Sequence, residues 1–229
     1  MPTERAALET AQLREGGLRE RHKLARRTRI LEAARELLRE RPDDPLTAER
    51  IAERAEVAPA TVYNLVGPRD KIWQALAASF LGELEQRLAE AHTRDAIGRA
   101  QEVVAQTVDL FIENASVSRR ILIEWEQSGL VLSRGPLSHL RHALADAQRT
   151  GLLRTDIDVA TLAGVVASAS VGVTHQWIAG QIDEQQFAAQ ALLALDVALA
   201  AAAVDQQRSH FLSRLNSHRT VRPTTRQTT

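Results

Sequence analysis

The sequence contains no cysteine, which excludes disulfide bonds, thiolate zinc sites and cysteine nucleophiles. Aromatic residues make up only 3% of the chain, and lysine occurs only at Lys23 and Lys71, so nearly all basic side chains are arginines. No apolar run is long enough for a signal peptide or a membrane span, and the first apolar cluster, residues 6–8, ends at Glu9. These absences predict a cytoplasmic protein that does not enter a membrane.

The net charge is zero, but the charges are unevenly distributed along the chain. Residues 74–204 carry 15 acidic and 9 basic side chains, whereas residues 19–29 carry six basic side chains and a single acidic one. A basic run of this density can engage a phosphate backbone, although most charge runs are simply solvated helix faces. The local charge therefore makes nucleic-acid binding an interpretation to test against the motifs.

Apolar residues recur every three to four positions along most of the chain, which predicts an all-α protein. One helix is expected over residues 23–40, followed by two short ones at 47–55 and 58–64 and by a longer one that begins after Pro68. The remaining helices are expected at residues 95–114, 117–130, 136–151, 157–180 and 183–213.

The two short helices form a predicted helix-turn-helix, supported by the longer helix before them. Ala52 is small enough to let the second short helix cross closely, and Ile51, Val57 and Val62 fill the space between the two. Pro59 stands in the first turn of the second helix, a position that proline favours. The first residues of this second helix then project methyl, hydroxyl and amide groups outward, as a helix in the major groove of DNA does.

Residues 47–72, TAERIAERAEVAPATVYNLVGPRDKI, resemble the signature of the TetR family of transcriptional regulators. The positions that match the family pattern are Thr47, Ile51, Ala52, Ala55, Val57, Thr61, Val62 and Tyr63. The resemblance implies that Tyr63 reaches a phosphate, while residues at the start of the recognition helix read bases. The residues expected to bind DNA are Thr47, Ala58, Pro59, Ala60, Thr61, Tyr63, Asn64, Arg69 and Lys71.

Several positions depart from the family pattern. Glu56 stands where the turn usually has glycine, and a left-handed backbone at a residue with a side chain costs about 1 kcal/mol. Ala58 replaces the serine that usually caps the recognition helix, and loss of such a cap costs about 1 kcal/mol. Arg69 replaces a lysine, but an arginine can still hold a phosphate. We therefore expect a strained or reshaped turn in an otherwise intact fold.

The chain is expected to divide into an N-terminal three-helix head and a C-terminal helical body. Residues 1–22 are expected to form a flexible basic arm and residues 23–72 the helix-turn-helix DNA-binding domain. Residues 73–213 are expected to form the ligand-binding and dimerisation domain, and residues 214–229 a disordered tail.

No enzyme signature is found in the body. There is no nucleophile elbow, no glycine-rich phosphate loop and no two-histidine zinc motif, so no catalytic residue, metal or cofactor is expected. His139 and His142 can share a helix face, but no third metal ligand is apparent near them. Glu124 lies in the apolar run ILIEW, where its carboxylate points either into water or into a cavity.

Apolar residues spread over four helices of the body are expected to surround a ligand cavity. They are Val104, Val108, Phe111, Leu122, Trp125, Leu140, Leu144, Val173 and Trp177. Such a lining suits a small, mostly apolar effector and matches a strongly ionic one poorly. Binding of this effector is expected to weaken operator binding.

A homodimer is expected, because the helices at residues 157–180 and 183–204 are apolar on more faces than one subunit can cover. The contacts are expected from Gly164, Ala167, Ser168, Val171 and Gly172 on the first helix and from Ala191, Leu195, Ala198, Leu199 and Ala202 on the second. A two-fold dimer presents two recognition helices, so the double-stranded DNA operator should be an inverted repeat.

Two functions remain open at this point, and both use the same head. The first is a transcriptional repressor released by a small effector. The second is a DNA-bound interaction or architectural protein whose acidic body recruits a protein partner. A body cavity of several hundred Å³ favours the repressor released by an effector, which we call the sensor. A solid body with an exposed apolar patch favours the DNA-bound protein that recruits a partner, which we call the recruiter.

Overall fold

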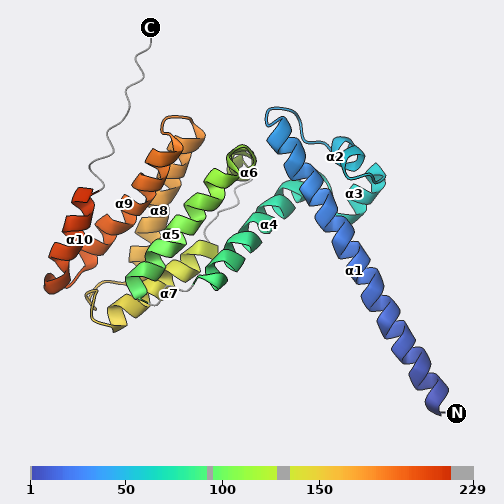
Figure 1. The fold of residues 1–229 in the computed structure, drawn as a ribbon, viewed down its shortest axis with the longest axis horizontal. Coiled ribbons are helices and arrows are strands. Elements are labelled where there is room, and N and C mark those ends of the chain that lie inside the picture. Colours follow the sequence, from blue (N-terminus) through green and yellow to red (C-terminus); the bar gives the residue numbers. More distant parts are fainter. Residues whose placement is uncertain (1, 92–94, 128–134, 218–229) are drawn as a thin grey trace, which may run out of the picture. The chain divides into compact units, whose positions relative to one another are not determined.

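A computed structural model describes the backbone of residues 2–91, 95–127 and 135–217, and the side chains of residues 19–91, 95–124 and 136–215. This part of the chain forms ten α-helices, and its only β-type pairing is a single isolated bridge (Figure 1). The predicted all-α class, with a helix-turn-helix near the N-terminus, is confirmed.

The helices separate into two compact units. The first, which we call the head, comprises Met1–Ser79 together with Arg120–Trp125. The second, the body, comprises Phe80–Arg119 and Glu126–Thr229. The boundary falls within two helices, since residues of α4 (Arg69–Glu90) and of α6 (Ala115–Gln127) belong to both units.

Helix α1 spans Pro2–Glu40 and is drawn as one unbroken helix in Figure 1. Its end matches the prediction, but its start does not, because the helix was expected only from residue 23 and a flexible arm over residues 1–22. From Pro2 onward the backbone is helical instead. Proline suits the first turn of a helix, and the residues that follow are rich in alanine, glutamate and arginine, which favour helix. The apolar residues of this segment form no continuous stripe, so hydrophobic periodicity did not predict a helix before residue 23.

The head packs α1, α2 (Ala48–Arg54) and α3 (Pro59–Leu65) around one core. The side chains at its centre are at most 2% exposed: Ile30, Ala34, Leu38, Ile51, Ala52, Val62, Ile72 and Leu76. Ala52 and Val62 are the small and branched residues that the sequence assigned to the crossing of the two short helices. A polar clamp joins α2 to α1, where Arg54 donates hydrogen bonds to Glu40 at 2.7 Å and to Glu36 at 3.2 Å. The hydrogen bond from Arg54 holds the pKa of Glu40 below its usual value.

The body consists of α5 (Ala96–Glu113), α7 (Gly135–Arg149), α8 (Val159–Ile178), α9 (Glu184–Ala202) and α10 (Asp205–Ser217), together with its shares of α4 and α6. Aspartates begin three of these helices, because Asp95, Asp158 and Asp183 each accept a backbone N–H three residues on. Helix α5 packs against α7 and α9, and α8 packs against α7 and α9. Ion pairs reinforce this layout, for example Arg99 with Asp146 at 2.6 Å between α5 and α7.

The single helix expected over residues 183–213 is two helices in the structure. Ala203 has an extended backbone and pairs with Leu153 in the isolated bridge, while Val204 N–H donates to the carbonyl oxygen of Leu152. This pairing with a distant segment ends α9, and neither proline nor glycine marks the break in the sequence. Helix α10 then runs to Ser217, so the expected disordered tail from residue 214 is corrected for its first four residues, and residues 218–229 lie outside the described part.

Helix α9 is long and apolar enough to cross a membrane by length and composition, and no other helix meets this test among the residues that the structure describes. From the sequence, no run of this length and hydropathy was expected. A helix at the centre of a soluble domain also satisfies this test, and α9 packs against α5, α8 and α10. Its residue Asp196 is 1% exposed and lies 3.5 Å from the guanidinium of Arg214 on α10.

Candidate functional site: nucleic-acid interface and internal cavity

The first short helix, α2, begins at a capped end. Thr47 is the N-cap, and its side-chain oxygen accepts a hydrogen bond from the Arg50 backbone N–H at 3.4 Å. A hydroxyl that accepts in this way still has its own proton to donate. Thr47 is half-buried, so this proton can serve an acceptor at the surface, such as a phosphate oxygen.

The turn between α2 and α3 has the two departures that the sequence predicted. Glu56 has a left-handed backbone with φ 53°, where the family pattern has glycine. Ala58 is the N-cap of α3 and provides no side-chain hydrogen bond. Both the strained turn and the missing cap are therefore confirmed, while the fold of the head is unchanged. The turn is closed by a hydrogen bond of 2.9 Å from Val57 N–H to the carbonyl oxygen of Ala52.

Helix α3 has one buried side and one exposed side. Val62 is 0% exposed and fixes α3 in the core of the head. Tyr63 is 49% exposed, Pro59, Ala60 and Asn64 are exposed, and Thr61 is half-buried. A phenol, an amide, a hydroxyl and two apolar groups therefore stand on the outer side of a short helix whose inner side is anchored. These are groups that contact phosphates and base edges in a major groove.

Two basic residues at the start of α4 complete the predicted set. Lys71 is exposed, and its Nζ donates to the Gln74 side chain at 2.9 Å. Arg69 has a side chain that is 62% exposed, and it donates to Glu124 of α6 at 2.7 Å. Glu124 is only 12% exposed and also lies 3.5 Å from Arg120. Its carboxylate therefore points neither into open water nor into a cavity, but to two arginines.

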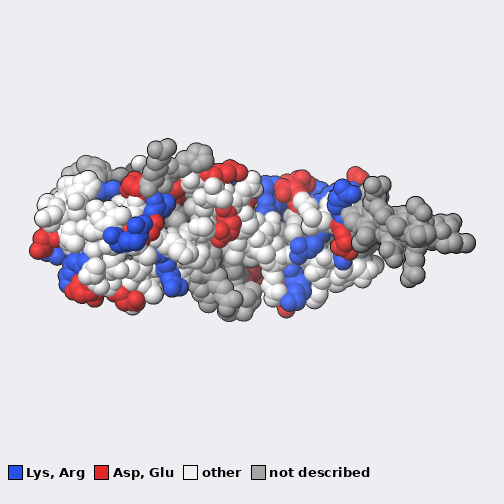
Figure 2. All heavy atoms as spheres, turned by 90° about the horizontal axis from the view of Figure 1, so that it is seen from below, with Lys and Arg blue, Asp and Glu red and all other residues white. Residues whose placement is uncertain are grey.

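The basic run near the middle of α1 lies at the surface of the head. Lys23, Arg26 and Arg29 are exposed, and Lys23 has a distant partner in Glu20 at 3.9 Å. On the face drawn in Figure 2, basic and acidic side chains are interspersed, so that face carries no extended patch of one sign. The candidate nucleic-acid interface comprises the groups described above on α3 and its neighbours in the head.

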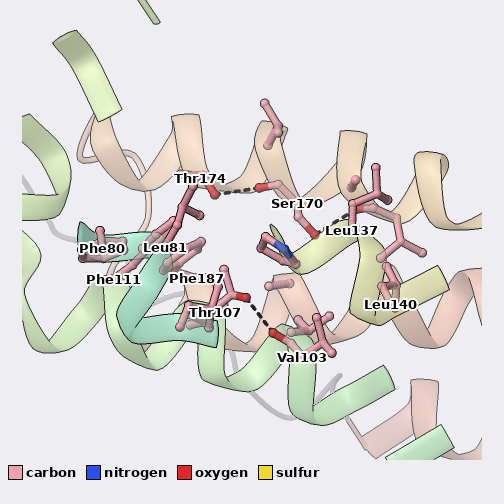
Figure 3. Close-up of a pocket in the computed structure, with 18 residues that line it drawn as sticks. Phe80, Leu81, Val103, Thr107, Phe111, Leu137, Leu140, Ser170, Thr174 and Phe187 are labelled. Carbon is pink, nitrogen blue, oxygen red and sulfur yellow. Dashed lines mark hydrogen bonds between the residues drawn. The ribbon is translucent and has the colours of Figure 1, made fainter. Parts of the chain in front are cut away.

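The body contains a cavity of about 140 Å³ between α4, α5, α7, α8 and α9 (Figure 3). Its lining residues all belong to the body: Phe80, Leu81, Leu84, Val103, Val104, Thr107, Val108, Phe111, Pro136, Leu137, Leu140, Val166, Ala167, Ser170, Val171, Thr174, Phe187 and Ala191. None of these described lining residues carries a charged side chain. Three phenylalanines form one part of it, with Phe111 5.3 Å from Phe80 and 6.4 Å from Phe187 between ring centroids.

Four of the residues predicted from sequence line the cavity, namely Val104, Val108, Phe111 and Leu140. Leu122, Leu144, Val173 and Trp177 do not. Trp177 is fully buried behind the lining, stacked on Phe187 at 4.9 Å, with the Arg119 guanidinium 4.7 Å from its ring centroid. The side chain of Trp125 lies outside the described residues.

The two histidines on α7 have different surroundings. Nε2 of His139 lies 2.6 Å from the carboxylate of Glu85 on α4, and His142 is exposed. Within the described residues, no group of three His, Asp or Glu side chains is arranged to hold a metal ion.

The head is matched by a known family. Residues 30–65 match the model described as bacterial regulatory proteins, tetR family, and this range covers the second part of α1 and all of α2 and α3. The resemblance to the TetR family is confirmed.

Solved structures extend the TetR-like fold to most of the chain. A TetR-family transcriptional regulator from Rhodococcus sp. is 20% identical with a TM-score of 0.61, and the match covers 76% of this chain and 99% of that one. SmeT, the repressor of the Stenotrophomonas maltophilia multidrug efflux pump SmeDEF, is 25% identical with a TM-score of 0.59, covering 78% and 91%. CprB from Streptomyces coelicolor is 19% identical with a TM-score of 0.59, covering 86% and 100%. No curated protein matches the chain.

Most residues that line the cavity in this TetR-like body were not predicted from the sequence. Among them are the three hydroxyl residues Thr107, Ser170 and Thr174. One signal was available, because Val166, Ser170 and Thr174 are spaced four residues apart and therefore lie on one face of α8. Thr107 likewise sits within the apolar stripe of α5, between Val104 and Val108. A polar residue inside an apolar helical stripe marks a place where the stripe meets something other than a packed core.

Proposed function

We propose that this protein is a homodimeric transcriptional regulator that binds an inverted-repeat DNA operator through its head and is released by a small apolar effector bound in the body. The observation that carries the DNA-binding part is the two-sided structure of α3, with Val62 fully buried and Tyr63 and Asn64 turned outward. CprB, whose fold the chain shares, has been solved in complex with its biological operator sequence.

Selection from random duplex DNA with the full chain should return an enriched inverted repeat. In binding titrations, Tyr63→Phe should lower the affinity for that site and for other DNA sequences alike by a few-fold, since a phosphate contact carries no information about the base. Asn64→Ala should instead change the base preference at one position of each half-site. Arg69→Ala should weaken binding and lower the slope of affinity against salt by about one.

Arg149→Ala is the matched control for Arg69→Ala, because Arg149 is a 73% exposed arginine on α7 of the body. It should leave both affinity and salt slope unchanged. Failure of the selection to enrich any site, with all head variants binding like the parent, would rule out the assignment of the head.

The dimer is supported by apolar side chains left at the surface of α8 and α9. Val165 is 58% exposed and Val197 52%, although both stand on helices of the body core. The interface residues expected on α9 need correction, because they are buried within the single chain: Ala191, Leu195, Ala198, Leu199 and Ala202 are at most 7% exposed. The outer side of α9 is formed by Val197 and Ala201 instead.

Sedimentation equilibrium should therefore show a dimer at micromolar concentration. Val165→Asp combined with Val197→Asp should give a folded monomer, since two buried charges without partners oppose the interface. Leu24→Asp, at a 64% exposed apolar residue of α1, should leave the dimer intact. A parent protein that sediments as a monomer would remove the dimer and, with it, the expectation of an inverted repeat.

The effector is supported by the cavity, whose described lining residues are mostly apolar and carry no charge. At about 140 Å³ it is smaller than the several hundred Å³ that would suit a drug-sized ligand, and it matches a molecule of about one ring. An engineered cavity of about 150 Å³ in another protein binds benzene. SmeT, which is 25% identical, has been solved in complex with triclosan.

Val108→Phe provides the test, because Val108 lines the cavity and is 4% exposed, so the added ring has only the cavity to enter. This variant should bind operator like the parent and should no longer respond to apolar compounds that release the parent. If no compound in a broad apolar screen raises the melting temperature or lowers operator affinity, the recruiter function would replace the sensor.

A further inference from the structure

The cavity should bind some mostly apolar molecules better than others, because three hydroxyl groups interrupt its apolar lining. Thr107 projects from α5, and Ser170 and Thr174 project from α8 (Figure 3). The other lining residues are phenylalanine, leucine, valine, alanine and proline. Among the described lining residues, the polar chemistry that the side chains offer to a bound molecule is therefore confined to these hydroxyls.

All three hydroxyl protons are already committed to the backbone of their own helix. Thr107 donates to the carbonyl oxygen of Val103 at 2.7 Å, Ser170 to that of Val166 at 2.9 Å, and Thr174 to that of Ser170 at 2.8 Å. A hydroxyl has one proton and two acceptor sites. The oxygens at the cavity are thus left with acceptor capacity only.

A hydrogen-bond acceptor on a ligand therefore costs more free energy to bury in this cavity than a hydrogen-bond donor does. An acceptor on the ligand can be satisfied only if a hydroxyl turns away from its carbonyl and gives up an intrahelical hydrogen bond. A donor on the ligand adds a hydrogen bond while the existing ones stay in place. A charged group meets no counter-charge among the described lining residues, so these residues do not compensate its desolvation.

We infer that the cavity selects an uncharged aromatic molecule of about one ring that carries a hydrogen-bond donor, such as a phenol or an aromatic N–H, and that Thr107, Ser170 and Thr174 are the acceptors that select it. The inference rests on the proposed effector site and adds the chemistry of its ligand. The rings of Phe80, Phe111 and Phe187 supply the aromatic part of the lining.

Three small probes isolate the donor. p-Cresol and anisole are isomers, and only p-cresol has a hydroxyl proton, while p-xylene has the shape of p-cresol without the oxygen. Titration calorimetry with the full-length protein at neutral pH should give p-cresol an affinity about three- to tenfold above that of anisole, the effect of one hydrogen bond. Benzoate should not bind measurably.

The variants Thr107→Val, Ser170→Ala and Thr174→Val remove the acceptors one at a time with little change of shape. At least one of them should lower the affinity for p-cresol about three- to tenfold and leave the affinity for p-xylene unchanged, and p-xylene binding also verifies that the variant is folded around the cavity. Equal binding of p-cresol and anisole, or variants that leave p-cresol binding unchanged, would overturn the inference and keep the effector site. Absence of binding by p-cresol, anisole and p-xylene alike would overturn both the inference and the effector part of the proposed function, while operator binding would still stand on its own test.

Discussion

In the head, the side chains of Ile30, Ile51 and Val62 are fully buried, whereas in the body Val104 and Phe111 border a cavity of about 140 Å³. Both sets are apolar and shielded from water. The difference lies in the cavity, since closely packed side chains hold the surface built on them in place and a cavity leaves room for a further molecule. The buried core of the head thus suits a fixed recognition surface, and the cavity of the body suits the binding of a small molecule.

The largest effect should separate the two cores directly. Ile51→Ala in the head should lower the free energy of unfolding by about 2–5 kcal/mol, because the side chain is 0% exposed and its removal leaves a new void. Val104→Ala at the cavity should cost less than half as much, because this side chain already lacks neighbours on one side. Urea unfolding followed by circular dichroism gives both values. Equal costs would show that the body is packed as tightly as the head.

The next effect concerns Glu56, the one residue other than glycine with a left-handed backbone in the described part of the chain. Glu56→Gly should raise the free energy of unfolding by about 1 kcal/mol, because glycine tolerates the left-handed backbone that Glu56 is forced to adopt. Glu53→Gly is the matched control, at an exposed glutamate three residues earlier within α2, and it should lower stability by about 1 kcal/mol. The two substitutions should shift the melting temperature in opposite directions, and a shift in the same direction would argue against strain at Glu56.

A somewhat smaller effect is expected at the start of α3. Ala58→Ser should stabilise the head by about 0.5–1 kcal/mol, since serine supplies the cap that Ala58 lacks. Thr47→Ala removes the existing cap of α2 and should destabilise the head by a similar amount. Thermal unfolding of the two variants provides the comparison, and a neutral Ala58→Ser would mean that the start of α3 is already satisfied in another way.

The smallest effect should be seen in operator affinity. Glu124→Gln leaves Arg69 without its anionic partner at 2.7 Å, so its guanidinium becomes free to pair with a DNA phosphate. An ion pair whose arginine is 62% exposed is worth at most about 1 kcal/mol, which limits the gain to about two- to fivefold tighter binding. Added to Arg69→Ala, the same substitution should not change affinity relative to the Arg69→Ala variant alone, and a gain that persists in this background would place its cause elsewhere.

The part of the head from residue 23 onward could be predicted from the sequence closely, because its elements depend on local signals, whereas the helical start of α1 was not predicted. Thr47 starts α2, Pro59 stands in the first turn of α3, and the strain at Glu56 follows from one missing glycine. The break at Ala203 has no local signal, since it is made by pairing with Leu153. Periodicity could not find it.

The cavity could be predicted only in part for a related reason. Periodicity shows which face of a helix is apolar, and it identified Val104, Val108 and Phe111 on α5. A cavity forms where the apolar faces of several helices do not pack fully against one another, so its position depends on how each helix is rotated about its axis. On α8, Val173 and Trp177 were predicted to line the cavity, whereas the residues that line it lie on the neighbouring face of the same helix, for example Val166 and Ser170.

Tyr63 is the only tyrosine in the chain, and it lies 49% exposed on the outer side of α3. Biosynthetic incorporation of fluorotyrosine therefore yields a protein with a single fluorine resonance, and that resonance originates at the proposed DNA contact. Operator addition should shift and broaden it without any need for assignment. A compound that enters the body and shifts the same resonance in the absence of DNA would report, from one spectroscopic line, that the cavity and the recognition helix are coupled.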